Sequence, residues 1–337
     1  MSQSATKVRL EDLDIKPYLI TKLKMAGIES VFDLAISIPH QLVDVGCRGT
    51  LTETNEHVAL ELVTKAKKAL VDSGLLFKDF STAQEILERR KNLLKCSTGS
   101  SKLDSFLKGG IETQAITEIA GEFGSGKSQI CYTLCVTANI PLDRKGLGGN
   151  VIFTDTENTF RAERIFQIAE HKGISEPDEI LRRIYVCKIY NTSHLEVIIQ
   201  DLGKSNEEYK AKLVMVDSII ALHRAEFTGR GTLAERLNIM LHKLSRLAEV
   251  HNIAVVITNQ VQSQPDDFSA GRDSLRATGG NVMGHASTYR ILLRKAGSTR
   301  IAIMIDSPCH AYDQTKFAIT EAGVQDVQEH NSTTSEW

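Results

Sequence analysis

The eight-residue segment GEFGSGKS, Gly121 to Ser128, constrains the fold of this chain more than any other stretch. It matches the pattern G-x-x-x-x-G-K-[ST] at every fixed position. Residues 114–120 before it are typical of a buried strand, and residues 129–139 after it are typical of a helix. A strand, a glycine-rich turn and a helix together aim backbone N–H groups and a helix dipole at a phosphate. The segment therefore predicts a phosphate-binding loop; the alternative is a glycine turn at the foot of an ordinary helix.

The predicted loop supplies the groups that hold a nucleoside triphosphate and its metal. Lys127 would reach the β- and γ-phosphates, and the Ser128 hydroxyl would bind Mg²⁺. The sequence therefore predicts ATP and Mg²⁺ as cofactors. The predicted ATP-binding residues of the loop are Gly121, Glu122, Phe123, Gly124, Ser125, Gly126, Lys127, Ser128 and Gln129.

Composition limits the kind of protein that this chain can be. Its 337 residues suffice for one large domain and a small one. The formal net charge of −2 gives no global basic field, so only a locally basic loop or groove could attract nucleic acid. The six cysteines form no C-x-x-C pair, which favours buried thiols in a reducing compartment. No apolar run reaches the roughly 18 residues of a membrane span and no signal peptide is evident, so we expect an intracellular protein with no membrane partner.

The pattern of apolar residues divides the chain into four parts. Residues 1–73 show apolar spacing of three and four, which predicts a small all-helical domain. Residues 74–95 are predicted to be a linker, and residues 327–337 a disordered tail. Across residues 96–326, short apolar runs alternate with amphipathic stretches. This alternation predicts an α/β core with a mainly parallel, twisted sheet.

The end of the predicted core has a different pattern. The apolar runs 289–293 and 301–305 are joined by the short polar segment RKAGSTR. This spacing predicts an antiparallel hairpin at the edge of the sheet.

One acidic residue follows a strongly apolar strand. Asp217 comes directly after four consecutive apolar residues in the segment LVMVDS. A buried carboxylate is costly unless a cation or hydrogen bonds meet it. We therefore expect Asp217 to hold the waters around Mg²⁺; the alternative is that it caps the following helix.

Polar residues also follow two other predicted strands. Asp155 and Glu157 lie at the carboxyl end of one strand, where ligands bind in open α/β sheets. Glu157 is the predicted general base, with helix capping as the alternative, and Asp155 suits capping better. Gln260 ends another strand and would sense the γ-phosphate and pass its state to the next segment. The predicted catalytic residues are thus Glu157, Lys127 and Gln260.

Two long segments without periodicity follow these strands. One runs from residue 261 to residue 280, and loops of about 20 residues inside compact domains are usually functional or disordered. The other spans residues 223–232 and carries Arg224 and Arg230 near glycines. Arg230 would meet phosphate; the alternative is a solvated surface arginine.

Six motifs together resemble the RadA family, the archaeal and eukaryotic branch of RecA-like DNA strand-exchange recombinases. The likeness covers about residues 8–326, and the motifs occur in family order: GGIETQAITEIAGEFGSGKSQIC, DTENTFRAERI, MVDSIIALHRAEFTGRGTLAERL, TNQV, TGGNVMGHAST and IDSPC. The resemblance implies a RecA-like P-loop ATPase core and a DNA-dependent ATPase. Such a protein would form helical filaments on single-stranded DNA and exchange strands with double-stranded DNA in recombinational repair. It would lie in the cytoplasm or nucleoid of an archaeon, or in a eukaryotic nucleus.

The resemblance also implies roles for single residues. The segment FSTA would dock on the next subunit of a filament through Phe80 and Ala83. Arg164 would lie near the adenine, and His285 and Asp306 would approach the ATP of a neighbouring subunit. The residues that match the family's DNA-binding loops are Arg224, Arg230, Arg272, Arg276, Gly279 and Gly280.

Three segments depart from the family pattern. The stretch LDIKPYL lacks the glycines of the family's helix-hairpin-helix, and residues 310–312 replace L-P-E after IDSPC. Asn158 stands where the family has glycine, which predicts a backbone conformation that Asn tolerates. The lost hairpin glycines and the altered segment after IDSPC favour an alternative reading, a non-exchanging paralogue that acts as a recombination mediator. The intact Lys127, Asp217 and Glu157, together with both loops and FSTA, count against it. Mediators are also expected as partners of a recombinase.

Overall fold

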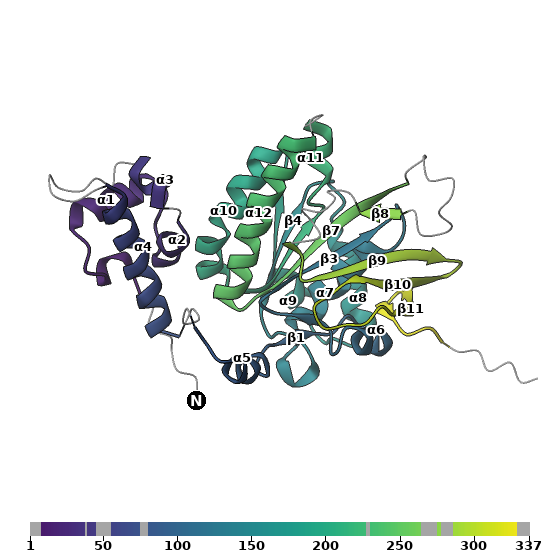
Figure 1. Ribbon diagram of the computed structural model, residues 1–337. Coiled ribbons are helices and arrows are strands. Elements are labelled where there is room, and N and C mark those ends of the chain that lie inside the picture. The colour runs from purple at the N-terminus through teal and green to yellow at the C-terminus, as the bar shows by residue number, and fades with distance from the viewer. Residues whose placement is uncertain are drawn as a thin grey trace, which may run out of the picture. The chain divides into compact units, whose positions relative to one another are not determined.

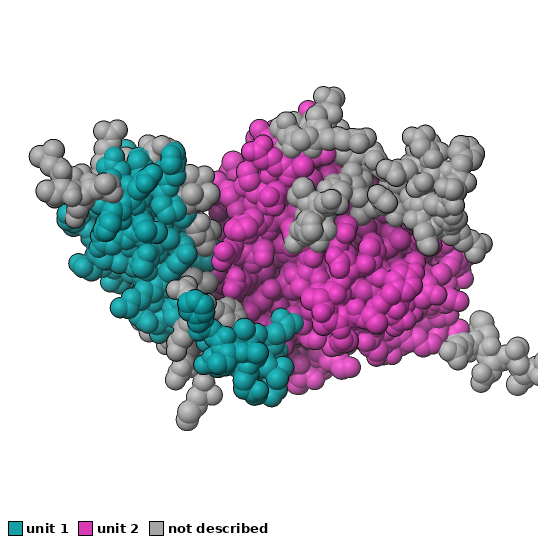
Figure 2. Space-filling model, in the orientation of Figure 1, with its two compact units in different colours: residues 1–91 teal, residues 92–337 magenta. Residues whose placement is uncertain are grey.

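The computed structural model describes residues 8–37, 39–44, 55–74, 80–226, 230–263, 275–277 and 286–328. The chain forms two compact units, Met1–Lys91 and Asn92–Trp337 (Figure 2). The helix at residues 83–90 groups with the first unit, whereas the sequence placed it in a linker over residues 74–95. Most of the predicted disordered tail, residues 329–337, lies outside the described residues.

The first unit is helical throughout its described residues. Its elements are η1 (Leu10–Asp12), α1 (Pro17–Met25), α2 (Val31–Ile36), α3 (Pro39–Asp44), α4 (Asn55–Asp72) and α5 (Ala83–Arg90). Helix α2 starts at a capping box, in which Ser30 Oγ accepts from the Asp33 N–H and Asp33 Oδ2 accepts from the Ser30 N–H, both at 3.0 Å. Apolar side chains three and four apart on α4, such as Val58 and Leu62, join the core of this unit.

The second unit alternates strands and helices. Its helices are α6 (Ser101–Phe106), α7 (Lys127–Asn139), η2 (Leu142–Arg144), α8 (Ala162–His171), α9 (Pro177–Arg182), α10 (Thr192–Tyr209), α11 (Ala221–Glu226) and α12 (Arg230–His251). Its strands are β1 (Lys95–Cys96), β2 (Ile111–Glu112), β3 (Ala115–Gly121), β4 (Asn150–Asp155), β5 (Ile184–Lys188), β6 (Ala211–Asp217), β7 (Ala254–Ser263), β8 (Leu275–Ala277), β9 (Tyr289–Ala296), β10 (Thr299–Asp306), β11 (Gln314–Thr320) and β12 (Gly323–Gln325).

One large sheet organises the second unit, with helices on both of its faces (Figure 1). The strand order is β12-β11-β10-β9-β3-β7-β6-β4-β5, and β8 pairs with β7. The strands from β9 to β5 along this path are parallel neighbours. Helices α7 and α8 pack on one face, and α10 and α12 pack on the other. The predicted α/β architecture with a mainly parallel sheet is confirmed.

The predicted hairpin of residues 289–293 and 301–305 forms, but its predicted place at the edge of the sheet is wrong. Strand β9 pairs in parallel with β3, and β10 pairs with β11, so β12 is the terminal strand on this side. Strand β11 leaves little trace in the apolar pattern because Phe317 is the one fully buried residue among its seven. A strand with so few buried positions lacks the apolar run that marks the central strands.

The cysteines follow the expectation of buried thiols only in part. Five cysteines in the described residues are free, and three of them, including Cys96, are buried. Burial raises the pKa of the Cys96 thiol to about 12. Cys309 is exposed in the segment after β10, and Cys187 is half-buried on β5, the last strand of the sheet path. The expectation is therefore wrong for these two, because both lie at the margins of the core.

Asp326 fastens the end of the second unit to the start of α6. Its Oδ1 accepts hydrogen bonds from Ser100 Oγ at 2.5 Å and the Lys102 N–H at 3.0 Å, and its Oδ2 accepts one from Ser101 Oγ at 2.5 Å. Partial burial acts to raise the pKa of this carboxyl. The hydrogen bonds outweigh that effect and hold the pKa at about 2, below the ordinary value of 3.8.

Asp326→Ala should lower the free energy of unfolding by about 1 kcal/mol at pH 7, because a partly exposed charged acceptor is lost. The folded-state pKa lies below the ordinary value, so the carboxylate stabilises the fold fully above about pH 4. That contribution is lost as the pH falls from about 4 to about 2. Urea unfolding of the full chain from pH 7 to pH 2 measures the difference, with Glu170→Ala on the exposed side of α8 as control. A difference between wild type and Asp326→Ala that does not shrink at low pH would contradict this assignment.

Candidate nucleotide-binding site

The predicted phosphate-binding loop lies between the central strand β3 and helix α7. All seven residues of β3 are buried, and α7 begins directly after Gly126, whose φ is +107°. A Cβ atom added to Gly121 would lie 2.4 Å from Ser125 Oγ and 2.8 Å from the Leu293 carbonyl oxygen. The loop therefore needs glycine at both positions, at one for space and at the other for a left-handed backbone.

Lys127 lies across this loop. Its ammonium donates hydrogen bonds to the carbonyl oxygens of Gly121 and Glu122, both at 2.9 Å. Burial lowers the pKa of Lys127, while the carboxylates of Asp217 and Glu157 act to raise it. The ammonium is thus held at the mouth of the loop, where phosphate oxygens would replace the two carbonyls as its acceptors.

Asp217 joins the loop to two neighbouring strands. Its Oδ2 accepts a hydrogen bond from Ser128 Oγ at 2.9 Å, and its Oδ1 accepts one from Thr258 Oγ1. Burial raises the pKa of Asp217, and the two hydroxyl donors act to lower it. Capping of the next helix, the alternative for Asp217, falls instead to Ser218, whose Oγ accepts from the Ala221 N–H at 3.2 Å.

The pair of Ser128 and Asp217 fits Mg²⁺. Mg²⁺ in nucleotide sites takes one or two protein oxygens together with phosphate oxygens and waters. A hydroxyl and a buried carboxylate within 2.9 Å of each other offer that donor set beside the phosphate loop. Clusters of three or more His, Cys, Asp or Glu that could hold a metal do not occur among the described residues, and a site of this kind needs none.

The turn after β4 presents Glu157 and is itself held by Asp155. The Asp155 carboxylate accepts hydrogen bonds from the N–H groups of Glu157 at 3.2 Å, Thr159 at 3.1 Å and Phe160 at 2.9 Å. Asn158 has φ of +55°, which confirms the predicted special backbone conformation. Asp155 therefore builds the turn, and the Glu157 side chain is left exposed at the sheet's carboxyl edge.

Strand β7 reaches this edge with two polar side chains that face the same way. Thr258 bonds Asp217, and Gln260 Nε2 donates to Glu157 Oε1 at 3.2 Å. The structure thus brings together the predicted base and the predicted γ-phosphate sensor. Thr258 is a partner that the sequence interpretation did not single out, although its hydroxyl at the end of an apolar strand was a signal.

Arg164 lies on the other side of the loop, where the resemblance placed the adenine. Its Nε donates to Gln129 Oε1 at 2.9 Å, and its terminal nitrogens donate to the carbonyl oxygens of Thr320 and Glu321. Burial lowers the pKa of this guanidinium. These bonds connect α8, α7 and the turn between β11 and β12 beside the loop.

The predicted DNA-binding residues are placed only in part. The backbone is described for three of them: Arg224 in α11, Arg230 in α12 and Arg276 in β8. The prediction of a loop over residues 223–232 is therefore wrong for residues 223–226 and 230–232, which are helical. The remaining predicted positions lie outside the described residues: Arg272, Gly279, Gly280 and also His285. Asp306 is the exposed last residue of β10.

Comparison with known proteins decides the family. The family model described as Rad51 matches residues 89–327. The chain belongs to the Rad51 family. It is also 44% identical over 326 residues to the DNA repair and recombination protein RadA of Cenarchaeum symbiosum (strain A), a match that covers 95% of this chain and 80% of that protein. The predicted family is thus confirmed. Within the described residues, no helix has the length and apolar character of a membrane span.

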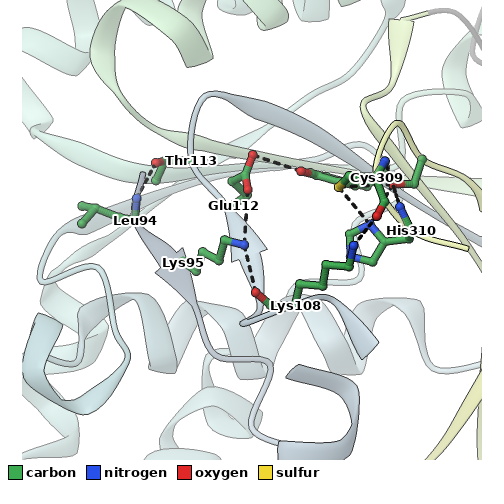
Figure 3. Close-up of polar contacts among 9 residues, drawn as sticks. Leu94, Lys95, Lys108, Glu112, Thr113, Cys309 and His310 are labelled. Atoms are coloured by element: carbon green, nitrogen blue, oxygen red, sulfur yellow. Dashed lines mark hydrogen bonds and ion pairs between the residues drawn. The ribbon is translucent and has the colours of Figure 1, made fainter. Parts of the chain in front are cut away.

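The segment after β10, where this Rad51-family chain departs from the L-P-E pattern, is tied to the loop after α6 (Figure 3). Lys108 Nζ donates to the Cys309 carbonyl oxygen, and Ser307 Oγ lies 2.7 Å from His310 Nδ1. Partial burial lowers the pKa of His310, and the nearby Lys108 acts in the same direction.

A buried carboxylate anchors the same region (Figure 3). Glu112 Oε1 accepts a hydrogen bond from the Tyr289 hydroxyl at 3.0 Å, and its Oε2 lies 3.4 Å from Lys95 Nζ. The ring of His310 stands edge-on to Tyr289, with centroids 5.5 Å apart. The altered segment is therefore packed into the fold through residues that this chain supplies.

Glu157→Gln should leave ATP binding intact and slow turnover on the order of 10²–10⁴-fold, because an amide cannot accept the proton of the attacking water. ATP affinity and single-turnover hydrolysis measure the two effects separately. Glu208→Gln, which removes an exposed carboxylate from α10, is the control. Turnover of Glu157→Gln within about threefold of wild type would move the role of general base to another group.

Proposed function

We propose that this chain is an ATP-dependent DNA recombinase that forms filaments on single-stranded DNA and catalyses homologous pairing and strand exchange. One observation carries the proposal. Strand β7 bonds the candidate nucleotide site through Thr258 and Gln260 and then continues as Val261–Ser263 into the predicted second DNA-binding segment. The similarity to a DNA repair and recombination protein RadA supports it.

The arrangement suits ATP hydrolysis that depends on DNA. Lys127 would neutralise charge on the β- and γ-phosphates, and Glu157 would take the proton of the attacking water. Mg²⁺, held by Ser128 and the waters around Asp217, would supply charge neutralisation between the phosphates. A γ-phosphate near Glu157 would compete for the amide of Gln260. The state of the nucleotide would thereby reach the segment that follows β7.

Contacts to DNA would be made mainly to the backbone. The formal net charge of −2 leaves attraction for phosphates to local groups, and Arg224, Arg230 and Arg276 are the candidates. Base pairing between strands would then test sequence, while the protein holds the strands in place. A recombinase of this kind works inside the cell, in the compartment that holds DNA.

Filament assembly would use an exposed aromatic side chain. Phe80 is 94% exposed just before α5, so its ring is available to another surface. Strand β5, at one end of the sheet path, carries the partly exposed Tyr185 and Val186. We infer that the Phe80–Ala83 peptide of one subunit docks on the next, where an apolar sheet edge would receive it.

Single-stranded DNA should raise the ATPase rate of the wild-type chain roughly fivefold or more, and the same sample should exchange strands between homologous DNAs. Lys127→Ala should lose nucleotide-supported DNA binding, because the phosphates lose their ammonium partner. ATPase and strand-exchange assays run in parallel measure both. Stimulation and binding without exchange would instead support the recombination-mediator alternative, and no DNA response at all would refute the proposal.

Phe80→Glu should convert the oligomer to monomers, because a carboxylate cannot enter an apolar pocket without a partner. Light scattering with and without ATP measures the mass. Met25→Glu is the matched control, since Met25 is another exposed apolar residue of the first unit, 84% exposed. Oligomers that persist in Phe80→Glu would show that assembly uses another surface.

A further inference from the structure

Three consecutive residues of β7, at the point where its pairing with β3 ends, each bond a different acidic residue. Thr258 bonds Asp217, and Gln260 bonds Glu157, as described above. Asn259, between them, donates from Nδ2 to Glu118 Oε1 at 2.7 Å. The first two contacts belong to the candidate nucleotide site. The third lies on the opposite face of β7, between two side chains that are 0% exposed.

Glu118 is an unusual residue for its position. It lies in the middle of β3, whose other residues are apolar or small apart from Thr117, and its side chain is 0% exposed. Its Oε2 accepts a hydrogen bond from Arg290 Nε at 2.6 Å, and the Arg290 side chain is 14% exposed. The carboxylate thus bonds a charged group on β9 and an amide on β7, one on each side of β3.

Strand register makes these contacts a continuous bridge. Arg290 is directly opposite Glu118 in the parallel pair β3–β9. In the pair β3–β7 the residue opposite Glu118 is Ile257, so Asn259 lies two positions further on the same face. We call the three residues Arg290, Glu118 and Asn259 the Asn259 tether.

The Asn259 tether is a poor device for stability alone. Replacing a buried ion pair by apolar residues of similar size is often neutral or stabilising, because both charges must leave water. The same face of the sheet is otherwise filled by apolar residues such as Ile116, Val255 and Ile257. A bridge of charged and amide groups in such a place fixes the relative positions of β9, β3 and β7. Apolar packing alone would hold these positions less specifically.

The Asn259 tether fixes the position of the part of β7 that carries Gln260, the predicted sensor. Successive side chains of a strand point to opposite faces, so Asn259 points away from the nucleotide site and Gln260 points into it. Pairing between β3 and β7 ends at Gly121 and Gln260. Beyond that point β7 pairs instead with β8, with Val261 opposite Ala277. Asn259 is therefore held just before the point where β7 stops pairing with β3 and begins to pair with β8.

We propose that the Asn259 tether is a pivot that couples the Gln260 sensor to the segment after β7. With Asn259 fixed, a change at Gln260 cannot be absorbed by rotation of the strand before it. The change must pass forward to Val261–Ser263 and to β8. Arg290 and Glu118 act as positioning residues, and they contact no nucleotide. This inference rests on the proposed function, since it concerns how ATP state and DNA binding communicate.

The test separates coupling from folding. Asn259→Leu removes the amide but keeps the volume and the Glu118–Arg290 pair. Two double variants form a matched pair without buried charge: Glu118→Gln/Arg290→Met keeps an acceptor for Asn259, and Glu118→Met/Arg290→Met does not. Thermal unfolding, ATP affinity, and ATPase rates with and without single-stranded DNA are measured for each full-length variant and for wild type.

The expected result is a loss confined to coupling. Asn259→Leu and Glu118→Met/Arg290→Met should keep ATP affinity and the DNA-free rate within about twofold of wild type, but lose stimulation by single-stranded DNA roughly fivefold or more. Glu118→Gln/Arg290→Met should retain most of the stimulation. The strength of DNA binding with ATP should fall in the same two variants.

Other outcomes refute the inference or the function beneath it. If Asn259→Leu is stimulated as well as wild type, or if the two double variants behave alike, the tether is not a pivot. If a double variant fails to fold, Asn259→Leu alone still decides, because it leaves the ion pair in place. If wild type itself shows no stimulation by DNA, the proposed function fails rather than the tether.

Discussion

The buried carboxylate of Asp217 is the constraint on which the rest of the site depends. It is 4% exposed, and it accepts hydrogen bonds from Ser128 at the start of α7 and from Thr258 on β7. A carboxylate in this place is costly unless donors or a cation meet it, so the loop and the strand that supply its two hydroxyl donors must form together. One acid therefore locks the phosphate loop to the strand that leads toward the predicted DNA-binding segment. Because the same contacts satisfy Asp217 and position the loop, stability and function depend on one arrangement at this edge of the sheet.

Much of this site could be predicted because the residues that form the phosphate loop follow one another in the sequence. The loop between Gly121 and Ser128 is specified by local conformation, since its glycines adopt backbone angles and spacings that other residues resist. The positive φ of Asn158 was predictable for the same reason, because the backbone conformation of a single residue restricts which residue types can occupy it. The alternation of strands and helices likewise gave the layer architecture, because burial on both faces leaves an apolar run that can be recognised without knowing its neighbours.

What the sequence did not reveal are ties between segments that are far apart along the chain. Asp326 bonds Ser100 across 226 positions, and Arg290 bonds Glu118 across 172. Strand β11 was missed because Phe317 alone is fully buried there, so its place is set by pairing with β10 rather than by its own pattern. A polar residue inside a strand can be satisfied by any of several distant partners, and single-sequence periodicity carries no signal for the choice. The DNA-binding assignments depend on resemblance for a related reason, since the sequence around Arg224, Arg230 and Arg276 shows no clear period although the three residues lie in α11, α12 and β8.

In the proposed mechanism, the two faces of β7 would let one strand both sense a nucleotide and stay fixed. Thr258 and Gln260 bond Asp217 and Glu157, the acids proposed to respond to metal and phosphate, whereas Asn259 bonds a carboxylate that is paired with Arg290. If all three side chains faced the nucleotide, β7 would have no fixed point. A change in the contact of Gln260 would then rotate the strand and would not reach the residues after it. If all three side chains faced Glu118 and Arg290, the strand would be rigid but would make no contact that depends on ATP. Alternation of a pleated strand gives both properties within three residues, and it does so where pairing with β3 ends and the next residues of β7 pair with β8 instead.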